Sequence, residues 1–331
     1  NEHTTTLQTM MSETLTFNQQ LEQFSFLSAL NFDSTTNNSS SKTDEPLKVV
    51  CSAAYLPKYS NPNRQGLIDC GEDAFFVSSY EKNVNVDDAR ICTISIADGV
   101  GGYAEMGIDS SMMAWSLMHG IQYYMENEPT LSCKEALVKA YEHIVEENLV
   151  LAGGSTACVL SLQNGKDEQG QSILKLTSAN LGDSGFLVVR DGAVVYRTND
   201  QTHQIFNMPK QLSVPIDPTI SYDSPHEADE IFDQPLELRR GDVIVAFTDG
   251  VSDNLFDKDM AEIVASRQIT TTSDYDTSSS QSIANDILRS AVVRSRSQFL
   301  NTPFAEYSRT FGYDYSGGKL DDITVVVCTV V

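Results

Sequence analysis

The sequence predicts an α+β protein in which two stacked, mainly antiparallel sheets are flanked by helices, a four-layer α/β/β/α sandwich. Several strand-like runs are almost continuously apolar, so both of their faces should be covered. Neighbouring runs are joined by turn dipeptides that favour antiparallel hairpins, Asn164-Gly165 and Asp191-Gly192. Only a few segments carry apolar residues at helical spacing. Helices that cover the two outer faces of the stacked sheets account for these segments.

Residues 1–46 differ in composition from the rest and predict an N-terminal extension to one folded domain, which spans 47–331. Five apolar side chains recur at spacings of three and four and define one helical face: Phe17, Leu21, Phe24, Leu27 and Leu30. Residues 34–46 are rich in Ser, Thr and Asn and predict a linker.

The helix of residues 17–30 is expected to dock on the folded domain. A dimer contact and a membrane surface are the alternatives. Its polar face carries Glu13 and Glu22 instead of Lys or Arg, so it lacks the charges that attract anionic lipids. Membrane contact through this helix is therefore not favoured.

The first half of the folded domain is predicted to contain strands, two helices and a meander. Apolar and β-branched runs predict strands over 49–56 and 91–97. Stripes at helical spacing predict helices over 108–121 and 137–145. Four short runs joined by turns predict an antiparallel meander: 156–162, 174–181, 186–190 and 193–197.

The second half is predicted to hold strands over 243–248 and 323–330, with a helix over 283–292 between them. Two segments are expected to form long loops outside the predicted strands and helices. They are 200–235, which is rich in Pro and His, and 299–318, which is rich in Tyr and Gly. Because loops of this length usually carry function, substrate choice is expected to reside there.

Charge and length exclude several classes of protein. The 331 residues carry a net charge of −24, which argues against a nucleic-acid partner because binding to a phosphate backbone needs a basic surface. An anionic substrate must then be attracted locally, by bound cations. No run approaches the roughly 18 apolar residues of a membrane span. The start at Asn1, without Met or a targeting pattern, is expected to reflect a processed or truncated product.

The six cysteines are widely spaced, which predicts free thiols in a reducing compartment. Cys51, Cys92, Cys158 and Cys328 lie in apolar strand-like runs, where a thiol packs as a small hydrophobe.

Acidic residues stand at the ends of apolar runs that lie far apart in the sequence. Asp98, Asp249 and Asp321 each adjoin a predicted strand, and Glu72-Asp73 precedes a fourth apolar run. Buried carboxylates are costly unless a cation meets them, and a divalent ion commonly serves several at once. A single Asp-Gly after a strand is usually only a turn, but four acidic sites in one setting indicate a metal centre.

The oxygen-rich donor set predicts Mg²⁺ or Mn²⁺. Glu72, Asp98, Asp249 and Asp321 supply enough oxygens for two ions if Asp98 bridges them, and Gly99 and Gly250 let backbone carbonyls come close. Two such ions can hold a hydroxide for an in-line displacement, so the pattern predicts hydrolysis of a phosphate ester. Zinc does not fit, because none of the five histidines pairs with a cysteine at ligand spacing.

Gly182-Asp183-Ser184-Gly185 looks like a serine-protease motif. A nucleophilic serine needs a base and an orienting acid, and no such partners accompany this one. The motif follows a strand and is expected to open a hairpin, which makes Asp183 a carboxylate at a sheet edge and Ser184 a turn residue.

The ordered acidic motifs resemble those of the metal-dependent protein phosphatases, the type 2C serine/threonine phosphatases. The resemblance covers about residues 50–330 and implies that family's layered fold. It rests on six motifs: Glu72-Asp73, Ala97-Asp98-Gly99, Gly154-Ser155-Thr156-Ala157, Asn180-Leu-Gly-Asp-Ser184, Phe247-Thr-Asp-Gly-Val251 and Asp321-Asp-Ile-Thr-Val325.

The resemblance implies a ligand set. Asp98, Asp249 and Asp321 would hold one ion, and Glu72, Asp98 and the Gly99 carbonyl would hold the second. Asp73 would hold a metal-bound water, and Asp183 with Asp249 matches the position of a third, weaker ion. Asp98 and Asp249 would thus be catalytic, and Asp322 would support them from a position where the family usually has Asn.

Two positions depart from the family pattern. The arginine that usually anchors the phosphate is replaced by Ile68, which leaves Lys58, Arg64 or the metals alone for substrate binding. The histidine that often follows Asp-Gly is replaced by Val100, so the leaving group would be protonated by a metal-bound water or by another residue, with His203 as the candidate.

Asp98-Gly-Val-Gly-Gly-Tyr103 and the segment 201–212 resemble a mitochondrial branch of the family, the homologues designated number seven. This implies a location in the mitochondrial matrix and phosphorylated matrix proteins as substrates, including enzymes of coenzyme Q synthesis. The alternative is a phosphatase-like binding protein without catalysis, which the departures at Ile68 and Val100 motivate.

Overall fold

The computed structural model describes residues 46–59, 68–80, 88–215, 217, 219, 221–268 and 277–331. The predicted helix of residues 17–30, most of the predicted linker and Arg64 lie outside these ranges. The division of the chain at residue 46 therefore stays a prediction.

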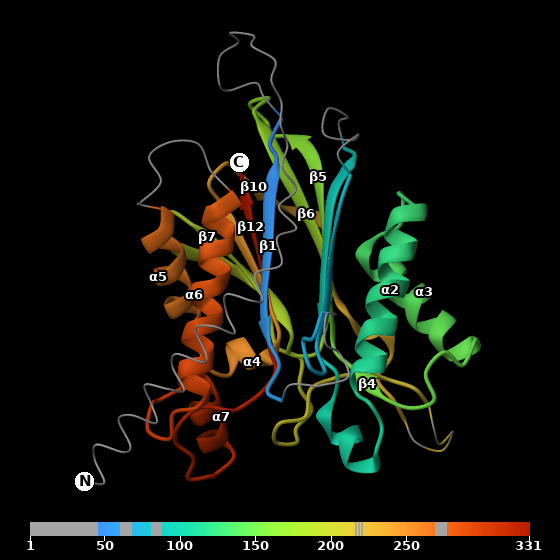
Figure 1. The fold of residues 1–331 in the computed structure, drawn as a ribbon. Coiled ribbons are helices and arrows are strands. Elements are labelled where there is room, and N and C mark those ends of the chain that lie inside the picture. The colour runs from blue at the N-terminus through green and yellow to red at the C-terminus, as the bar shows by residue number, and fades with distance from the viewer. Residues whose placement is uncertain are drawn as a thin grey trace.

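Two five-stranded antiparallel sheets are stacked face to face (Figure 1). The first sheet has the order β1 (Val49–Leu56), β12 (Ile323–Val330), β11 (Val243–Phe247), β7 (Gly185–Arg190) and β8 (Ala193–Arg197). The second has the order β10 (Asp229–Leu238), β6 (Ser172–Leu181), β5 (Ala157–Lys166), β3 (Arg90–Ala97) and β2 (Ala74–Ser79). A short pair adjoins them, β4 (Gly154–Ser155) with β9 (Leu212–Ser213).

Helices cover the outer faces of both sheets, which confirms the predicted four-layer α/β/β/α arrangement (Figure 1). The second sheet is covered by α2 (Ser111–Asn127) and α3 (Cys133–Glu146). The first is covered by α4 (Asp249–Ser252), α5 (Asp257–Gln268) and α6 (Thr277–Ser295). The shorter elements are α7 (Pro303–Thr310) and the 3₁₀ turns η3 (Gly101–Met106) and η4 (Pro225–Glu227).

Three apolar cores explain why the central strands read as continuous apolar runs. In β7, Phe186 and Val188 face the core between the sheets, whereas Leu187 and Val189 face the core beneath α5 and α6. Because successive side chains on a strand point to opposite faces, a strand with helices on one side and a sheet on the other needs apolar residues at every position.

Three local predictions were wrong. The four predicted strands of the meander divide between the two sheets, because the chain crosses from β6 to β7 at Gly182-Asp183-Ser184 instead of opening a hairpin there. Asn164-Gly165 lies inside β5, and the turn follows it. The two predicted loops contain β10 and α7. The ten residues of β10 are mostly exposed and include several acidic side chains, so the sequence does not show the apolar pattern of a buried strand there.

The prediction of free thiols was wrong for one pair. Cys51 and Cys328 are directly opposed on β1 and β12 and form a disulfide. Cys92 and Cys158 are free and buried, which confirms the prediction that they pack as small hydrophobes, and Cys70 and Cys133 are also free and buried.

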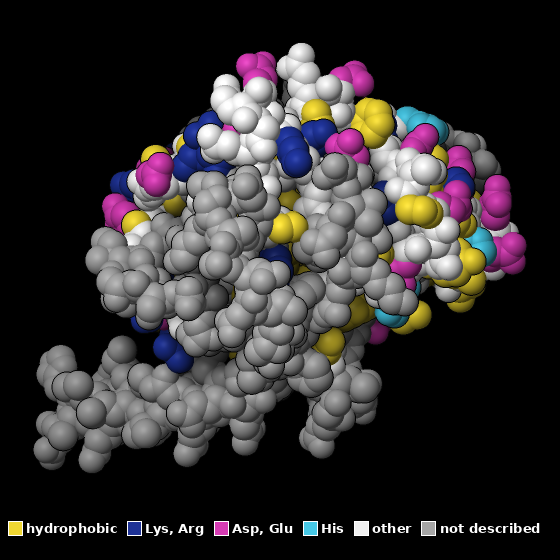
Figure 2. All heavy atoms as spheres, turned by 90° about the horizontal axis from the view of Figure 1, so that it is seen from above, with side chains coloured by type: hydrophobic (Ala, Val, Ile, Leu, Met, Phe, Trp, Pro, Cys, Tyr) yellow, Lys and Arg dark blue, Asp and Glu magenta, His cyan; other side chains and the backbone are white. Residues whose placement is uncertain are grey.

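The face drawn in Figure 2 shows Lys and Arg side chains interspersed with Asp and Glu among its described residues. Among the described residues, no helix combines the length and the apolar character that a membrane crossing would require.

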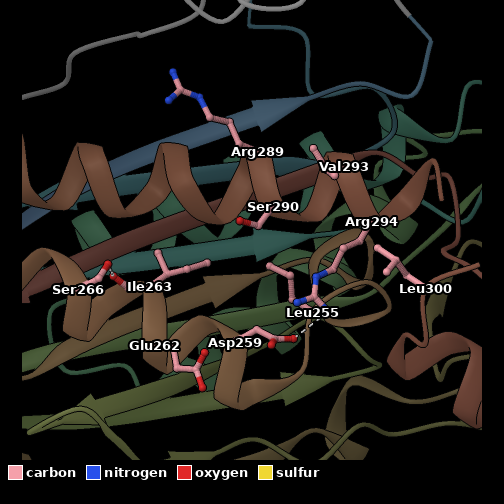
Figure 3. Close-up of a pocket in the computed structure, with 10 residues that line it drawn as sticks. All are labelled: Leu255, Asp259, Glu262, Ile263, Ser266, Arg289, Ser290, Val293, Arg294 and Leu300. Carbon is pink, nitrogen blue, oxygen red and sulfur yellow. Dashed lines mark hydrogen bonds and ion pairs between the residues drawn. The ribbon is translucent and has the colours of Figure 1, made fainter. Parts of the chain in front are cut away.

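An open groove of about 600 Å³ lies between α5 and α6 (Figure 3). An ion pair between Asp259 and Arg294 crosses it at 3.1 Å. None of the acidic residues predicted to bind metal lines it, so this groove does not serve their chemistry. Its lining residues are Leu255, Asp259, Glu262, Ile263, Ser266, Arg289, Ser290, Val293, Arg294 and Leu300.

Gly182 is predicted to be needed where the chain changes sheets. Its φ is +102°, and an added Cβ would lie 2.6 Å from Thr156 Cγ2 and 2.7 Å from the Lys210 carbonyl oxygen. Gly182→Ala should therefore lower the free energy of unfolding by about 3 kcal/mol in urea titrations, from backbone strain plus overpacking.

Gly170→Ala is the matched control, because Gly170 also has a positive φ, of +78°, but has open space around its Cα. We expect a loss of about 1 kcal/mol there. Equal losses for the two variants would contradict the proposed crowding at Gly182.

Candidate metal centre

The predicted acidic residues lie together where strand ends of both sheets meet. The start of β2 pairs with the end of β3, so Glu72 and Asp73 lie beside Asp98. The end of β11 pairs with the start of β12, so Asp249 lies near Asp321. The crossover between the sheets adds Asp183. The layered fold thus brings residues from distant parts of the sequence to one edge.

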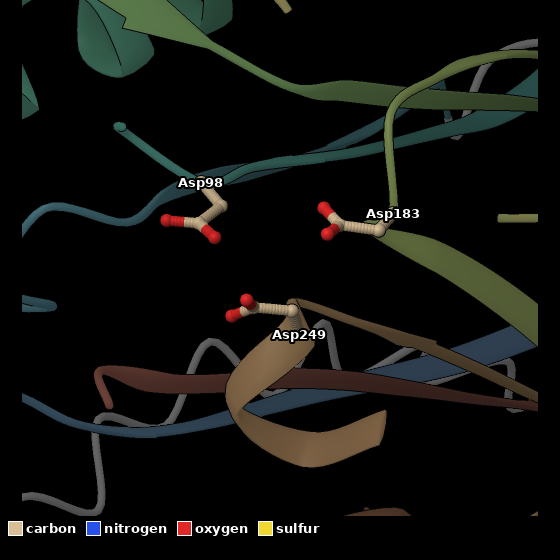
Figure 4. A group of neighbouring side chains, drawn as sticks. All are labelled: Asp98, Asp183 and Asp249. Carbon is tan, nitrogen blue, oxygen red and sulfur yellow. The ribbon is translucent and has the colours of Figure 1, made fainter. Parts of the chain in front are cut away.

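Asp98, Asp183 and Asp249 point toward a common space from three different elements (Figure 4). One carboxylate oxygen from each lies within 4.8 Å of the others, a spacing that could hold a metal ion. The backbone of Asp98 is fixed by Thr156, whose hydroxyl accepts from the Asp98 amide at 3.0 Å and whose amide donates to the Asp98 carbonyl at 2.9 Å.

Gly99 allows the end of β3 to approach β2. Its amide donates to the Glu72 carbonyl at 3.2 Å. An added Cβ would lie 2.5 Å from the Ser110 carbonyl oxygen and 2.6 Å from that of Glu72. Only glycine fits here, and the chain can therefore bring Glu72 beside Asp98.

Two lysines neutralise part of the acidic cluster. The Lys58 ammonium lies 2.9 Å from Glu72 Oε2 and 3.1 Å from Asp321 Oδ1. The Lys319 ammonium lies 2.5 Å from Asp249 Oδ2, 2.7 Å from Asp253 Oδ2 and 3.1 Å from Asp321 Oδ2. Each lysine therefore contacts residues that the family resemblance assigns to the metals.

Sequence reasoning did not single out Lys319 or Asp253. A signal for Asp253 was present, because it follows Asp249 by four residues and so shares its helix face. Lys319 lies in a glycine-rich stretch that shows no helix or strand periodicity. Its position two residues before Asp321 in the sequence was the one indication that it could lie in the site.

Burial and mutual repulsion set the protonation of the carboxylates. Burial raises the pKa of Asp98 well above the ordinary value, and the neighbouring charge of Asp249 adds to the shift. Burial likewise raises the pKa of Asp183. Asp321 is different, because the charges of Lys319 and Lys58 outweigh its burial and lower its pKa. Burial and like charge therefore favour the neutral forms of Asp98 and Asp183, whereas the two lysines favour the charged form of Asp321.

Asp322 and Asp73 support the cluster from behind. Asp322 Oδ1 accepts from the Lys58 amide at 2.6 Å, and its Oδ2 accepts from the Glu72 amide at 2.9 Å. Asp73 is fully buried, and its Oδ2 accepts from the Thr248 hydroxyl at 2.9 Å. These bonds tie the segment before β2 to the end of β11 and to the start of β12.

Two buried carboxylate oxygens, Asp73 Oδ1 and Asp183 Oδ1, have no hydrogen-bond partner among the described residues. Buried polar atoms are normally paired, and oxygens left over in an acidic cluster are suited to metal ions and their waters. The residues present thus fit the divalent cations that the sequence predicts.

The other predicted residues are placed as follows. Ser184 is fully buried, and its Oγ shares a hydrogen bond of 2.7 Å with Thr156 Oγ1, which rules it out as an exposed nucleophile. His203 Nε2 pairs with Asp223 Oδ2 at 2.9 Å, outside the carboxylate cluster. Its predicted role as a proton donor stays a prediction.

Several known proteins with similar sequences are named as protein phosphatases. The protein phosphatase PTC7 homolog fig of Drosophila willistoni is 33% identical over 316 residues, which cover 94% of this chain and 93% of that protein. The protein phosphatase PTC7 homolog of Danio rerio is 32% identical over 265 residues, which cover 78% of this chain and 81% of that protein. No protein-family model matches the chain.

Solved phosphatase structures share the fold. The photosystem II phosphatase PBCP has a TM-score of 0.62 at 24% identity, covering 86% of this chain and 99% of that one. The catalytic domain of the serine threonine protein phosphatase PstP, in complex with two manganese ions, has a TM-score of 0.51 at 18% identity, with the same coverage of both chains.

Two stacked sheets with a carboxylate cluster at their joint edge define the class of metal-dependent phosphatases. The identity with relatives across nearly the whole chain shows that this protein belongs to the type 2C serine/threonine protein phosphatase family, alongside the PTC7 homologues. It is therefore a metal-dependent serine/threonine protein phosphatase.

Metal affinity is predicted to fall as the pH falls. The pKa values of Asp98 and Asp183 are raised in the metal-free protein, so each retains its proton to a higher pH than a free aspartate does. A bound ion must displace such protons, and the apparent affinity for Mn²⁺ should drop by roughly tenfold per pH unit for each proton displaced.

Calorimetric titration of the metal-free protein with Mn²⁺ between neutral and mildly acidic pH would measure this slope. Runs in buffers of different ionisation enthalpy count the protons released. An affinity that is independent of pH, with no proton release, would contradict the assignment of these buried carboxylates as ligands.

Proposed function

We propose that this phosphatase hydrolyses phosphoserine and phosphothreonine in proteins without a covalent intermediate, using two Mg²⁺ or Mn²⁺ ions. Asp98, Asp249 and Asp321 would hold one ion; Glu72, Asp98 and the Gly99 carbonyl would hold the second, with Asp73 behind them. The observation that supports this most is that oxygens of Asp98 and Asp249 lie within 4.8 Å of each other and of Asp183, which the family resemblance assigns to a third, weaker ion.

When bound, two such ions supply a hydroxide for direct attack on phosphorus and neutralise charge on the phosphoryl oxygens. The chain supplies the geometry. Asp98 is shared between the two sets, and its backbone is fixed by Thr156. Asp322 holds the Glu72 amide, so the ligands from both sheets keep their spacing. Direct attack agrees with the burial of Ser184, the serine that most resembles a nucleophile.

Lys58 is our proposed phosphate anchor in place of the arginine that the family usually has. Its side chain is 24% exposed and its ammonium reaches Glu72 and Asp321. When ions bind to Glu72 and Asp321, these carboxylates can no longer pair fully with Lys58. Its ammonium can then bind an anionic group of the substrate. Arg64, the other candidate, lies outside the described residues.

For the leaving group, His203 remains our proposed proton donor, with a water at the site as the alternative. Its imidazole is held by Asp223 and is partly exposed. If His203 donates the proton, His203→Gln should slow the release of serine, a poor leaving group, but not that of nitrophenol, which needs no proton. Equal effects on both substrates would contradict the role.

We further propose a mitochondrial matrix location and matrix phosphoproteins as substrates, among them enzymes of coenzyme Q synthesis. The support is the motif resemblance at residues 98–103 and 201–212 and the similarity to PTC7 homologues. Fractionation of cells that express the natural full-length protein tests the location, and recovery outside mitochondria would contradict it.

Asp98→Asn and Asp249→Asn should each reduce phosphate release from a phosphothreonine peptide by roughly 10²–10³-fold with Mn²⁺, because each loses a charge that stabilises the transition state. Asp88→Asn is the control, since Asp88 is exposed and pairs with Lys175. Near-normal turnover in either site variant would refute the ligand assignment. Absence of turnover in the wild-type protein would favour a binding protein without catalysis.

Lys58→Met should raise KM for the same peptide about tenfold or more and weaken inhibition by inorganic phosphate, because a charged hydrogen bond contributes about 1.5–3 kcal/mol. Lys175→Met, which removes a lysine from the surface pair with Asp88, serves as the control. The affinity for Mn²⁺ must be measured alongside. Unchanged inhibition by phosphate would argue that Lys58 does not contact the substrate.

A further inference from the structure

The groove between α5 and α6 is bordered by exposed apolar side chains. Leu255, which is buried, and Ile263, which is partly buried, line it. Val293 and Leu300 also line it, and they are 64% and 45% exposed. Phe299, next to Leu300 in the sequence, is 89% exposed. Single exposed apolar residues are ordinary, but several beside one groove indicate a contact surface.

The two sides of the groove carry opposite charges. Asp259 and Arg294 pair with each other across it at 3.1 Å. Arg289, on α6, points away from α5 and has no ion-pair partner among the described residues (Figure 3). Glu262 lies on α5. A partner with negative charge would therefore be attracted to the α6 side.

The described chain begins close to α6. Residue 46 precedes β1, and α6 packs across β1, where the Ser280 hydroxyl donates to the Val50 carbonyl at 3.1 Å (Figure 1). Residue 289 lies about 14 Å farther along α6. Residues 31–45 can span about 50 Å when they are extended. The segment that precedes them can therefore reach the groove.

A second groove, of about 460 Å³, lies beside α3 and β10. Helix α3 covers the second sheet, whereas β1 belongs to the first (Figure 1). A segment that precedes β1 would have to pass around both sheets to reach this second groove.

The sequence before residue 46 supplies a partner that matches the groove between α5 and α6. Within residues 17–30, four apolar side chains recur at helical spacing: Phe17, Leu21, Phe24 and Leu27. Such a stripe is typical of amphipathic helices that bind in apolar grooves. Glu22 is the charged residue of this segment, and residues 1–41 contain no Lys or Arg. The negative charge suits the α6 side of the groove.

The groove adjoins the metal centre through the main chain. The Leu300 carbonyl accepts from the Gly317 amide at 3.0 Å, in the loop that leads to Asp321. The Leu255 amide donates to the Val251 carbonyl of α4 at 2.8 Å. A helix that covers Leu255 and Leu300 would therefore brace both segments.

We propose that residues 17–30 of this same chain dock as an amphipathic helix in the groove between α5 and α6. The apolar face of the helix covers Val293 and Leu300, and Glu22 is directed toward Arg289. This docking is independent of the proposed two-metal function, so the failure of either one leaves the other intact.

Photo-cross-linking in the full chain tests the docking. Phe24 is replaced by p-benzoylphenylalanine, and the peptide that it captures on irradiation is located by mass spectrometry. We expect capture within 255–266 or 289–300. In an equal mixture of unlabelled and ¹⁵N-labelled chains, each cross-linked pair should carry one label. Capture of another segment, or no capture, would overturn the proposal. Pairs of mixed label would also overturn it, because the partner would then be a second copy of the chain.

Val293→Glu should lower the yield of this cross-link about tenfold or more, because it places a carboxylate under the apolar face of the helix, where burial without a partner is costly. Leu151→Glu is the matched control, since Leu151 is 91% exposed and lies outside the groove. Its yield should equal that of the wild type. An undiminished yield in Val293→Glu would refute the docking, and the wild-type cross-link decides the question even if this variant does not fold.

Hydrogen exchange gives a second readout that needs no foreign residue. The amides of residues 17–30 should exchange more slowly in the wild type and in Leu151→Glu than in Val293→Glu. Equally fast exchange in all three proteins would contradict the docking. Slow exchange that appears only when anionic lipid vesicles are added would place the segment on a membrane surface instead.

Discussion

Repulsion among buried carboxylates is the constraint on which the site depends. Asp73, Asp98 and Asp183 all have raised pKa values because they are buried beside other acids. Such a cluster is stable only with protons or cations among its oxygens. Lys58 and Lys319 supply two positive charges to the cluster. One oxygen each of Asp73 and Asp183 has no hydrogen-bond partner among the described residues and is available to a bound cation or its waters. The two lysines therefore neutralise only part of the negative charge of the site, and bound metal ions would neutralise more of it.

The backbone of the layered fold holds these carboxylates close together in spite of their repulsion. Antiparallel pairing of β2 with β3 and of β11 with β12 brings strand starts and strand ends to one edge. Glycines permit close approach there, and Asp322 and Thr248 bind across the gap between segments. The loop before β12 is fastened to α4 through Asn254, so Lys319 and Asp321 belong to one fixed unit with Asp249.

Much of this could be predicted from local patterns. The strands 49–56, 193–197 and 323–330 have the predicted bounds, because their residue types and flanking turns agree with their tertiary surroundings. The acidic residues were visible because a charge next to an apolar strand is unusual. What escaped prediction depends on distant partners. Gly182 reads locally as a hairpin turn, yet its strands join different sheets. Cys51 meets Cys328 across 277 residues of sequence.

Diffraction from crystals grown with Mn²⁺, recorded at the manganese absorption edge, tests the central claim most directly. We predict two anomalous peaks about 3.5–4 Å apart, enclosed by oxygens of Glu72, Asp98, Asp249 and Asp321. An absence of peaks among these side chains under saturating Mn²⁺, or carboxylates that turn away from one another, would contradict the account.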